Sequence, residues 1–159
     1  LRQLIAYLRA AMPRLSDEAA TLAQELQLVR AYLELMHMRM PDRLQFDVAA
    51  IAHSASVRFP PMALLTLVEN AVRHGIDPGV DGGRIEVGGK LDAASGSMCL
   101  WVADTGVGMA ETAQPGTGLQ NVRSRLLAVY GAGARLELHA VAPHGVRAEL
   151  HFTFTGDTA

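Results

Sequence analysis

Residues 67–75 read L-V-E-N-A-V-R-H-G, a stretch in which polar side chains interrupt an apolar helical pattern. Its first positions continue an apolar helix, which is then interrupted by Glu69, Asn70, Arg73 and His74. Residues four apart lie on one stripe of a helix, so the pairs 69/73 and 70/74 project toward a common region. The pattern indicates a polar site on a buried helix. The alternative interpretation is an ordinary ion pair between residues 69 and 73, at a helix end that reaches solvent.

The segments around this stretch predict further helices. Pro60 and Pro61 are expected to begin the helix that ends at Gly75, since proline is favoured in a first turn. The spacing of Thr21 and Gln24 predicts a capping box, with a helix over 22–40 behind it. A short first helix is expected before Pro13.

The helix over 22–40 carries an apolar seam with spacings of 4, 3, 4, 3 and 4, made of Leu22, Leu26, Val29, Leu33, Met36 and Met40. Such a seam serves either a coiled-coil partner or packing on the adjacent domain, and both stay open.

The remainder of the chain alternates between strand patterns and turns. Strands are expected at 43–49, 84–91, 98–103, 135–141 and 146–154, and a last helix at 119–130. The fold class that follows is α+β: a two-layer α/β sandwich in which a mixed sheet lies under helices. We expect residues 1–40 to form an N-terminal helical extension and residues 41–159 to form the main domain.

One glycine-rich segment follows a predicted strand, and a second precedes a predicted helix. Residues 104–109 read D-T-G-V-G-M directly after a strand, where a carboxylate beside glycines suits a ligand with an exocyclic amine such as adenine. Residues 115–121 read P-G-T-G-L-Q-N, which places Gly116 and Gly118 at a helix start, where free N–H groups favour phosphate. Either segment alone is often an ordinary turn or loop. Neither the G-x-x-x-x-G-K-[ST] nor the G-x-G-x-x-G motif occurs, which disfavours P-loop and dinucleotide folds.

Composition excludes some partners. The net charge is −2 and the 14 basic residues are scattered, so nucleic acid is not expected as a partner. Cys99 cannot form an intramolecular disulfide, and its apolar surroundings predict a buried, inert thiol in a reducing cytoplasm. No apolar run is long enough to predict a membrane helix. The chain begins at Leu1, directly in a helical pattern, which suggests a fragment of a longer protein and is compatible with a membrane-anchored parent.

In order and spacing, the segments E-N-A-V-R-H-G, D-T-G-V-G and G-T-G-L-Q-N-V resemble the N, G1 and G2 boxes of the ATPase domain shared by histidine kinases, gyrase, Hsp90 and MutL. The stretches L-A-Q-E-L-Q-L-V-R-A-Y-L-E-L-M-H-M-R, F-P-P-M-A-L-L-T-L-V-E-N and G-L-Q-N-V-R-S-R-L-L-A-V-Y-G are most similar to LytS-type sensor histidine kinases. The likeness covers nearly the whole chain. It implies a Bergerat-type ATPase fold for residues 41–159 and the end of the dimerisation or linker helices for residues 1–40.

The resemblance also implies roles for individual residues. Asn70 would give an oxygen to Mg²⁺, Glu69 would be a general base or orient a metal-bound water, and Arg73 and His74 would lie near the phosphates of ATP. Residues 109–115 would form a lid over the nucleotide. The other cofactor-binding positions are Asp104 at the adenine amine, Gly106 and Gly108 for close approach, and Gly116, Thr117, Gly118 and Leu119 at the phosphates.

The activity implied is that of a protein histidine kinase. Such an enzyme passes the γ-phosphoryl group of ATP to a histidine in a dimerisation helix of the same or the partner subunit, and then to a response regulator. None of the six histidines lies in a P-H-F-x-x-N pattern, so the phosphoacceptor is expected outside this chain; His37 is the least implausible substitute. The resemblance further implies a homodimeric full-length protein, anchored in the inner membrane, with this domain in the cytoplasm. A non-catalytic nucleotide-binding or dimerisation module and a gyrase- or MutL-type ATPase are the alternatives.

Overall fold

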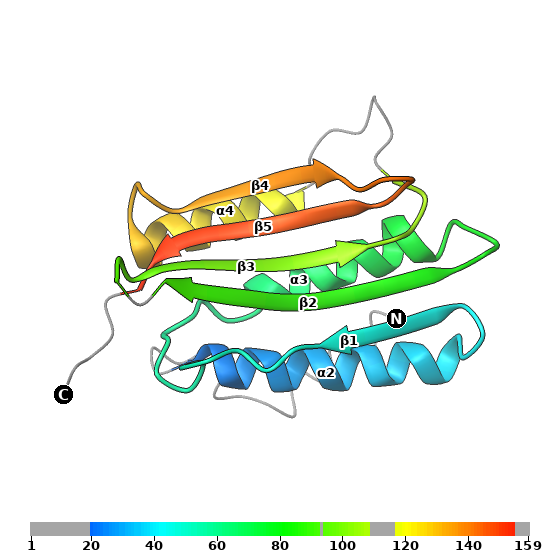
Figure 1. Ribbon diagram of the computed structural model, residues 1–159, viewed down its shortest axis with the longest axis horizontal. Helices are drawn as coiled ribbons and strands as arrows, with labels where there is room; N and C mark the ends of the chain where they lie inside the picture. Colours follow the sequence, from blue (N-terminus) through cyan, green and yellow to red (C-terminus); the bar gives the residue numbers. More distant parts are fainter. Residues whose placement is uncertain (1–19, 93, 109–116, 155–159) are drawn as a thin grey trace.

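A five-stranded mixed sheet with helices on one face makes up the protein (Figure 1). The computed structural model describes residues 20–92, 94–108 and 117–154. The strands are β1 (Leu44–Val48), β2 (Gly83–Asp92), β3 (Ser97–Asp104), β4 (Arg135–Ala140) and β5 (Val146–Thr153). The helical elements are α2 (Leu22–Arg39), α3 (Ala63–Asn70), the π-helix η2 (Ala71–Ile76) and α4 (Thr117–Tyr130). The predicted α+β class and two-layer architecture are confirmed.

The sheet has the order β1-β2-β3-β5-β4. β1 pairs with β2 in parallel, whereas every other neighbouring pair is antiparallel. Alternate residues face the helices, so Met98, Leu100 and Val102 of β3 are buried against them. The intervening residues lie on the opposite face, which we call the open face. Cys99 is one of these and is only partly buried, so the prediction of a buried thiol is wrong.

The five predicted strands are confirmed to within two residues at each end. The predicted capping box is confirmed as well, because Thr21 Oγ1 accepts the N–H of Gln24 at 3.3 Å and Gln24 Oε1 accepts that of Thr21 at 3.1 Å. The helix predicted before Pro13 lies outside the described residues. None of the helices within the described ranges has the length and apolar character needed to cross a bilayer.

The apolar seam of α2 packs inward. All six of its residues are buried, and α2 contacts both α3 and β1. Of the two alternatives that the spacing left open, packing on the adjacent domain is therefore the one observed. The seam belongs to the same apolar core as the sheet and α3. The division of the chain after residue 40 stays a prediction.

The start of α3 differs from the prediction. The helix begins at Ala63 rather than at the proline pair, and Met62 before it has a left-handed backbone with φ 71°. No side chain of this segment caps the helix. Instead the carboxylate of Glu25, on α2, accepts the N–H groups of Met62 and Leu65, both at 3.0 Å. A local pattern could not reveal this start, because the cap comes from another helix.

The end of the same helix also differs. The α-helix stops at Asn70, and six residues of π-helix follow. The N–H of Asp77 donates to the carbonyl of Val72, five residues back, at 2.8 Å. A π-turn is wider than an α-turn and occurs frequently at functional sites. Here it lies in the stretch that carries Arg73 and His74.

Arg43, which directly precedes β1, holds the end of this π-helix in place. Its Nη2 donates to the carbonyls of Ile76 and Asp77, both at 3.0 Å, and to that of Gly79 at 2.6 Å. The carbonyls at the end of a helix have no intrahelical partner, and a guanidinium supplies the missing donors together with a favourable charge. Arg43 therefore connects the polar stretch to the first strand.

Arg43→Ala is expected to lower the free energy of unfolding by about 2 kcal/mol, because partly buried carbonyls lose a charged donor. Chemical denaturation followed by circular dichroism measures this change. Arg39→Ala is the matched control, since Arg39 is an exposed arginine in the last turn of α2; surface substitutions of this kind usually change stability by less than about 0.5 kcal/mol. Equal destabilisation in both variants would contradict the proposed role of Arg43.

Candidate nucleotide site

Asp104 is the last residue of β3 and is buried, with 4% of its surface exposed. Its Oδ1 accepts the N–H of Gly106 at 2.9 Å. Burial raises the pKa of its carboxyl group, and the N–H groups of Gly106 and Val146 act in the opposite direction. A carboxylate in such a place is a strong acceptor for any donor that reaches it, since water competes little there.

Asp104 lies directly against the polar stretch. A Cβ added at Gly75 would lie 2.7 Å from Asp104 Oδ1, and one added at Gly106 would lie 2.1 Å from the carbonyl oxygen of Gly75. The N–H of Val107 donates to that same carbonyl at 3.0 Å. Only glycine fits at both positions, because a side chain at position 75 would meet the carboxylate of Asp104 and one at position 106 would meet the backbone of Gly75. Residues 67–75 and 104–108, far apart in the sequence, therefore contact each other.

The other end of the polar stretch meets α4. Asn70, half-buried at the last position of α3, has its Nδ2 4.0 Å from the place where a Cβ at Gly118 would lie. Thr66, one turn earlier, has its Cγ2 3.3 Å from the same place. Gly118 and Leu119 belong to the first turn of α4, which begins at Thr117. The first turn of α4 thus lies beside Thr66 and Asn70.

The other predicted positions within the described residues lie on η2, in the loop after β3 and at the end of α3. Arg73 and His74 are exposed on η2, and Gly108 has a φ of 84° in the loop after β3. Glu69 is half-buried and near α2: burial raises the pKa of the Tyr32 hydroxyl, and the charge of Glu69 adds to this. Gly116 and residues 109–115, predicted as phosphate ligand and lid, lie outside the described ranges.

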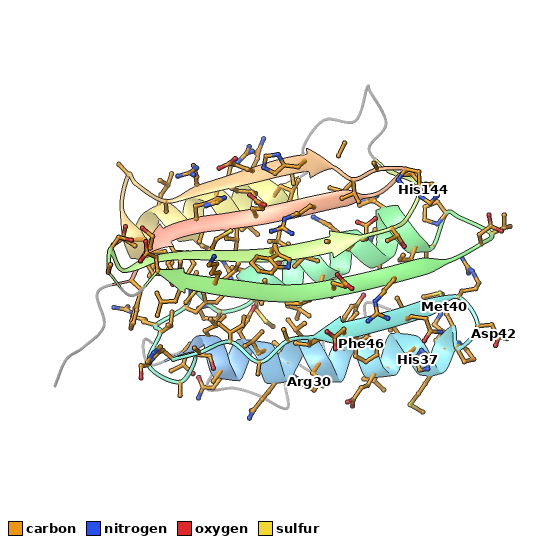
Figure 2. All side chains as sticks on the ribbon, in the orientation of Figure 1. Arg30, His37, Met40, Asp42, Phe46 and His144 are labelled. Atoms are coloured by element: carbon orange, nitrogen blue, oxygen red, sulfur yellow. The ribbon has the colours of Figure 1, made fainter. Side chains whose placement is uncertain are left out.

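The turn between β4 and β5 supports the same loop, which the sequence did not indicate. His144, labelled in Figure 2, has its Nδ1 2.6 Å from the carbonyl oxygen of Gly106. A Cβ at Gly145 would lie 2.0 Å from the carbonyl oxygen of Asp104. The segment Pro143-His144-Gly145 has the pattern of an ordinary hairpin connection, and nothing in its sequence specifies contact with residues 104–108.

His37 occupies a structural position between α2 and β1 (Figure 2). Its Nδ1 lies 2.6 Å from the carbonyl oxygen of Leu44, and its ring packs edge-on against Phe46 with centroids 6.2 Å apart. An imidazole held in this way stabilises the contact between helix and strand.

The described site has two chemically different ends joined by one helical stretch. One end offers a buried carboxylate beside glycine backbone, and the other offers the side-chain amide of Asn70 beside the first turn of α4. The first suits an amine donor and the second an anion, with Asn70 available to a hard cation. The donor set therefore fits an adenine nucleotide and Mg²⁺.

Comparisons with known proteins found similarities to histidine kinases. The family profile named histidine kinase matches residues 1–44. The sensor protein LytS of Staphylococcus haemolyticus is 31% identical over 158 residues, covering 98% of this chain and 26% of that protein. The sensor histidine kinase YesM of Bacillus subtilis is 28% identical over 138 residues, covering 84% of the chain and 24% of that protein. The chain thus spans about a quarter of the length of these relatives.

Among solved structures, the chain is similar to the histidine kinase domain of a blue-light activated histidine kinase from Erythrobacter litoralis. The TM-score is 0.64 at 15% identity, and the match covers 93% of this chain and 70% of that one. The chain therefore has the fold of a histidine kinase catalytic domain, and its sequence is similar to those of LytS-type sensor histidine kinases.

Proposed function

We propose that this domain binds ATP with Mg²⁺ and presents the γ-phosphoryl group to a histidine outside the described chain. The observation that carries the proposal is the convergence of Asp104, Gly75 and Gly106 at one end of the polar stretch and of Asn70 and Gly118 at the other. These are the two ends that an adenine nucleotide needs. When bound, ATP with Mg²⁺ supplies the transferable phosphoryl group.

At the adenine end, Asp104 accepts the exocyclic amine. Its Oδ1 is already fixed by the N–H of Gly106, so the carboxylate is oriented before any ligand arrives. Gly106 and Gly108 keep the adjoining backbone free of side chains and so permit close approach. The contact of Gly106 with Gly75 holds this loop against η2.

At the phosphate end, the first turn of α4 offers its N–H groups to the anion. Gly118 and Leu119 lie in that turn next to Asn70, and Gly116 and Thr117 adjoin it in the sequence. Arg73 and His74, exposed on η2, supply further cationic or hydrogen-bonding groups. We propose that residues 109–115 close over the nucleotide as a lid.

Asn70 gives its amide oxygen to Mg²⁺, which prefers oxygen ligands. Glu69, beside it in the sequence, is proposed as the general base that takes the proton of the attacking imidazole or orients a metal-bound water. The roles proposed for Asn70 and Glu69 follow from the family resemblance and from the position of Asn70 beside the first turn of α4. A purely dimerising module is less well supported, because the seam of α2 that would serve it lies in the core of the domain itself.

The whole protein is proposed to work as a two-component sensor. Its phosphoacceptor histidine lies in a dimerisation helix of the same or the partner subunit, its next acceptor is a response regulator, and the full-length protein is a homodimer. The domain is proposed to be cytoplasmic, in a protein anchored in the inner membrane. Residues 1–40 are proposed as the end of the linker helices, and 41–159 as the ATPase domain.

The proposal predicts magnesium-dependent nucleotide binding that depends on Asn70. Isothermal titration of the chain with a non-hydrolysable ATP analogue should give at least about tenfold higher affinity with Mg²⁺ than with a chelator, since Asn70 would hold the ion and the ion would offset the phosphate charge. In Asn70→Ala this difference should disappear, because the side-chain oxygen is lost.

Asn121→Ala serves as the control, since Asn121 is an exposed asparagine on α4. It should retain the magnesium dependence in full. Absence of nucleotide binding at millimolar concentration in the folded wild-type chain would refute the proposed function. Magnesium dependence that survives in Asn70→Ala would refute the role of Asn70 alone.

A further inference from the structure

The open face of the sheet carries a second group of chemically active side chains, on the side away from the helices. Glu137 and His139 lie on β4, Glu149 and His151 on β5, and Cys99 on β3. The strand register places Glu137 opposite Glu149 and Cys99 opposite His151. Residues two apart on a strand share a face, so all five side chains meet on three adjacent strands.

The distances within this group suit a metal ion. His139 Nε2 lies 3.3 Å from Glu137 Oε1 and 3.4 Å from Glu149 Oε1. His151 Nε2 lies 3.0 Å from Glu149 Oε1 and 3.3 Å from Glu137 Oε2. Nitrogen and oxygen ligands about 2.0–2.1 Å from a tetrahedral zinc ion are roughly 3.3 Å from one another. Each imidazole–carboxylate separation is therefore already close to an edge of that tetrahedron.

The two carboxylates of this group face each other across neighbouring strands. Glu137 and Glu149 are directly opposite each other on neighbouring antiparallel strands, which is unfavourable for like charges. Arg135 Nε lies 2.5 Å from Glu137 Oε2, and Arg147 Nε lies 2.6 Å from Glu149 Oε2. Each arginine thus contacts one oxygen of its glutamate. Oε1 of Glu149 faces both imidazoles, whereas in Glu137 Oε1 faces His139 and the Oε2 shared with Arg135 faces His151. Carboxylates that bind metals commonly have such outer hydrogen-bonding partners.

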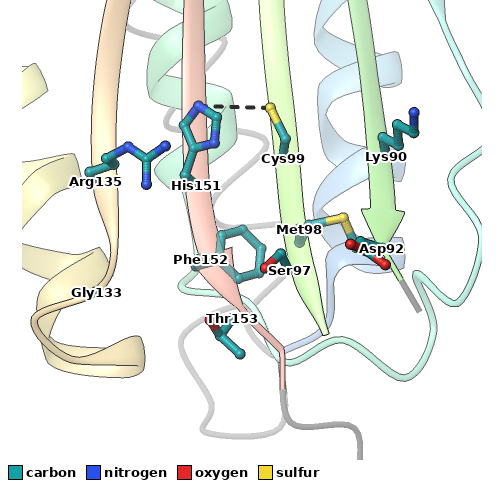
Figure 3. A pocket seen from close by; sticks show the side chains of 10 residues that line it. All are labelled: Lys90, Asp92, Ser97, Met98, Cys99, Gly133, Arg135, His151, Phe152 and Thr153. Carbon is teal, nitrogen blue, oxygen red and sulfur yellow. Dashed lines mark hydrogen bonds between the residues drawn. The ribbon is translucent and has the colours of Figure 1, made fainter. Parts of the chain in front are cut away.

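A hollow of about 300 Å³ adjoins the group and reaches His151 and Cys99 from solvent (Figure 3). The side chains of Glu149 and His151 are 16% and 23% exposed, and those of Glu137 and His139 are 33% and 48% exposed, so the group is shielded on the β5 side and open on the β4 side. Cys99 Sγ lies 3.9 Å from His151 Nε2, as the dashed line in Figure 3 marks. The group therefore has an entry path and a softer donor at its edge.

We propose that Glu137, His139, Glu149 and His151 bind a divalent transition-metal ion of the zinc type. Two neutral imidazoles and two carboxylates neutralise a doubly charged ion, and imidazole ligands favour zinc over magnesium or calcium. The site lies on the opposite face of the sheet from α3 and Asn70 and is independent of the proposed nucleotide site. Glu149 Oε1 lies within 3.4 Å of both imidazoles and is the ligand that they share.

The test is a calorimetric titration of the whole chain with Zn²⁺ in a non-chelating buffer, in the presence of millimolar Mg²⁺. Wild type should bind one equivalent with micromolar or tighter affinity. Loss of an outer-shell partner alone costs about 10- to 100-fold in metal affinity, so the double variant His139→Ala/His151→Ala should lose at least about 100-fold. Zn²⁺ should also raise the Tm of wild type and leave that of the double variant unchanged.

The matched control is His53→Asn. His53 is an exposed histidine outside the group, and asparagine tolerates its φ of 64°. This variant should bind Zn²⁺ like wild type, as should Cys99→Ser, because Cys99 is outside the proposed ligand set. Wild-type affinity no higher than that of the double variant would overturn the proposal. Loss of binding in Cys99→Ser, with binding retained in the double variant, would also overturn it.

Discussion

Asp104→Asn is expected to reduce the affinity for the magnesium complex of an ATP analogue by about 100-fold, corresponding to about 3 kcal/mol. The carbonyl of the introduced amide can face either the N–H of Gly106 or the adenine amine, but its NH₂ group then opposes the other donor. The native carboxylate can accept from both. The variant therefore has two donors facing each other in a buried site, and binding loses a charge-assisted hydrogen bond. Isothermal titration against wild type measures the loss.

Folding should survive this substitution. Burial raises the pKa of the Asp104 carboxyl group, so the charged form is costly in the absence of ligand, and a neutral isostere removes that cost. Thermal unfolding without nucleotide should therefore give a Tm close to that of wild type. Asp47→Asn, an exposed position on β1, is the control and should bind normally. Unchanged affinity in a folded Asp104→Asn variant would exclude Asp104 as the adenine ligand.

The strands and α2 could be predicted because their patterns are local. The alternation along 98–103 specifies which residues of β3 face the helices, and the Thr21/Gln24 spacing specifies the start of α2. The surface against which the apolar seam of α2 packs could not be predicted. A spacing of 4 and 3 fits any apolar surface, and only the three-dimensional arrangement shows that the surface is α3 and β1.

Local sequence patterns could not predict the two ends of the helical stretch over 60–76, for a different reason. Its start at Ala63 depends on Glu25 from another helix, and the π-helix after Asn70 accompanies the close packing of Gly75 against Asp104. Such tertiary contacts override local preference. The identity of the polar and glycine residues could still be predicted, because each requires its own chemistry whatever the helix type.

The open face shows the same limit. Each of Glu137, His139, Glu149 and His151 looks like an ordinary exposed strand residue in the sequence. The strand order β3-β5-β4 and the register bring them together. Strand order cannot be derived from alternation alone, since the same pattern fits several topologies.

Substitution of Glu25 is also expected to have a large effect, on the free energy of unfolding. It is 1% exposed, and its two oxygens accept the N–H groups of Met62 and Leu65 at the start of α3. Arg125 of α4 donates to the carbonyl of Pro61 just before that start. The N-terminus of the helix that ends at Asn70 is thus held from both neighbouring helices. The geometry of the candidate site depends on this fixed point.

Glu25→Ala is expected to lower the free energy of unfolding by about 3 kcal/mol, because two buried N–H groups lose their acceptor at about 1–3 kcal/mol each. Equilibrium denaturation measures this loss. Glu34→Ala is the matched control, since Glu34 is an exposed acid on the same helix, and it should change stability by less than about 0.5 kcal/mol. A loss no larger than that of the control would show that water replaces the carboxylate.

The pH dependence gives an independent measure of the same cap. Burial raises the pKa of Glu25 above its ordinary value of 4.5, although the N–H groups of Leu65 and Met62 act against this. For a raised pKa, the contribution to stability is fully present below the unfolded-state pKa and falls as the pH rises through the folded-state pKa. Glu25→Gln cannot titrate at this position. The stability of wild type relative to Glu25→Gln should therefore be greatest in acid and decrease above about pH 4.5. A difference that stays constant with pH would mean that the buried carboxyl group keeps its ordinary pKa.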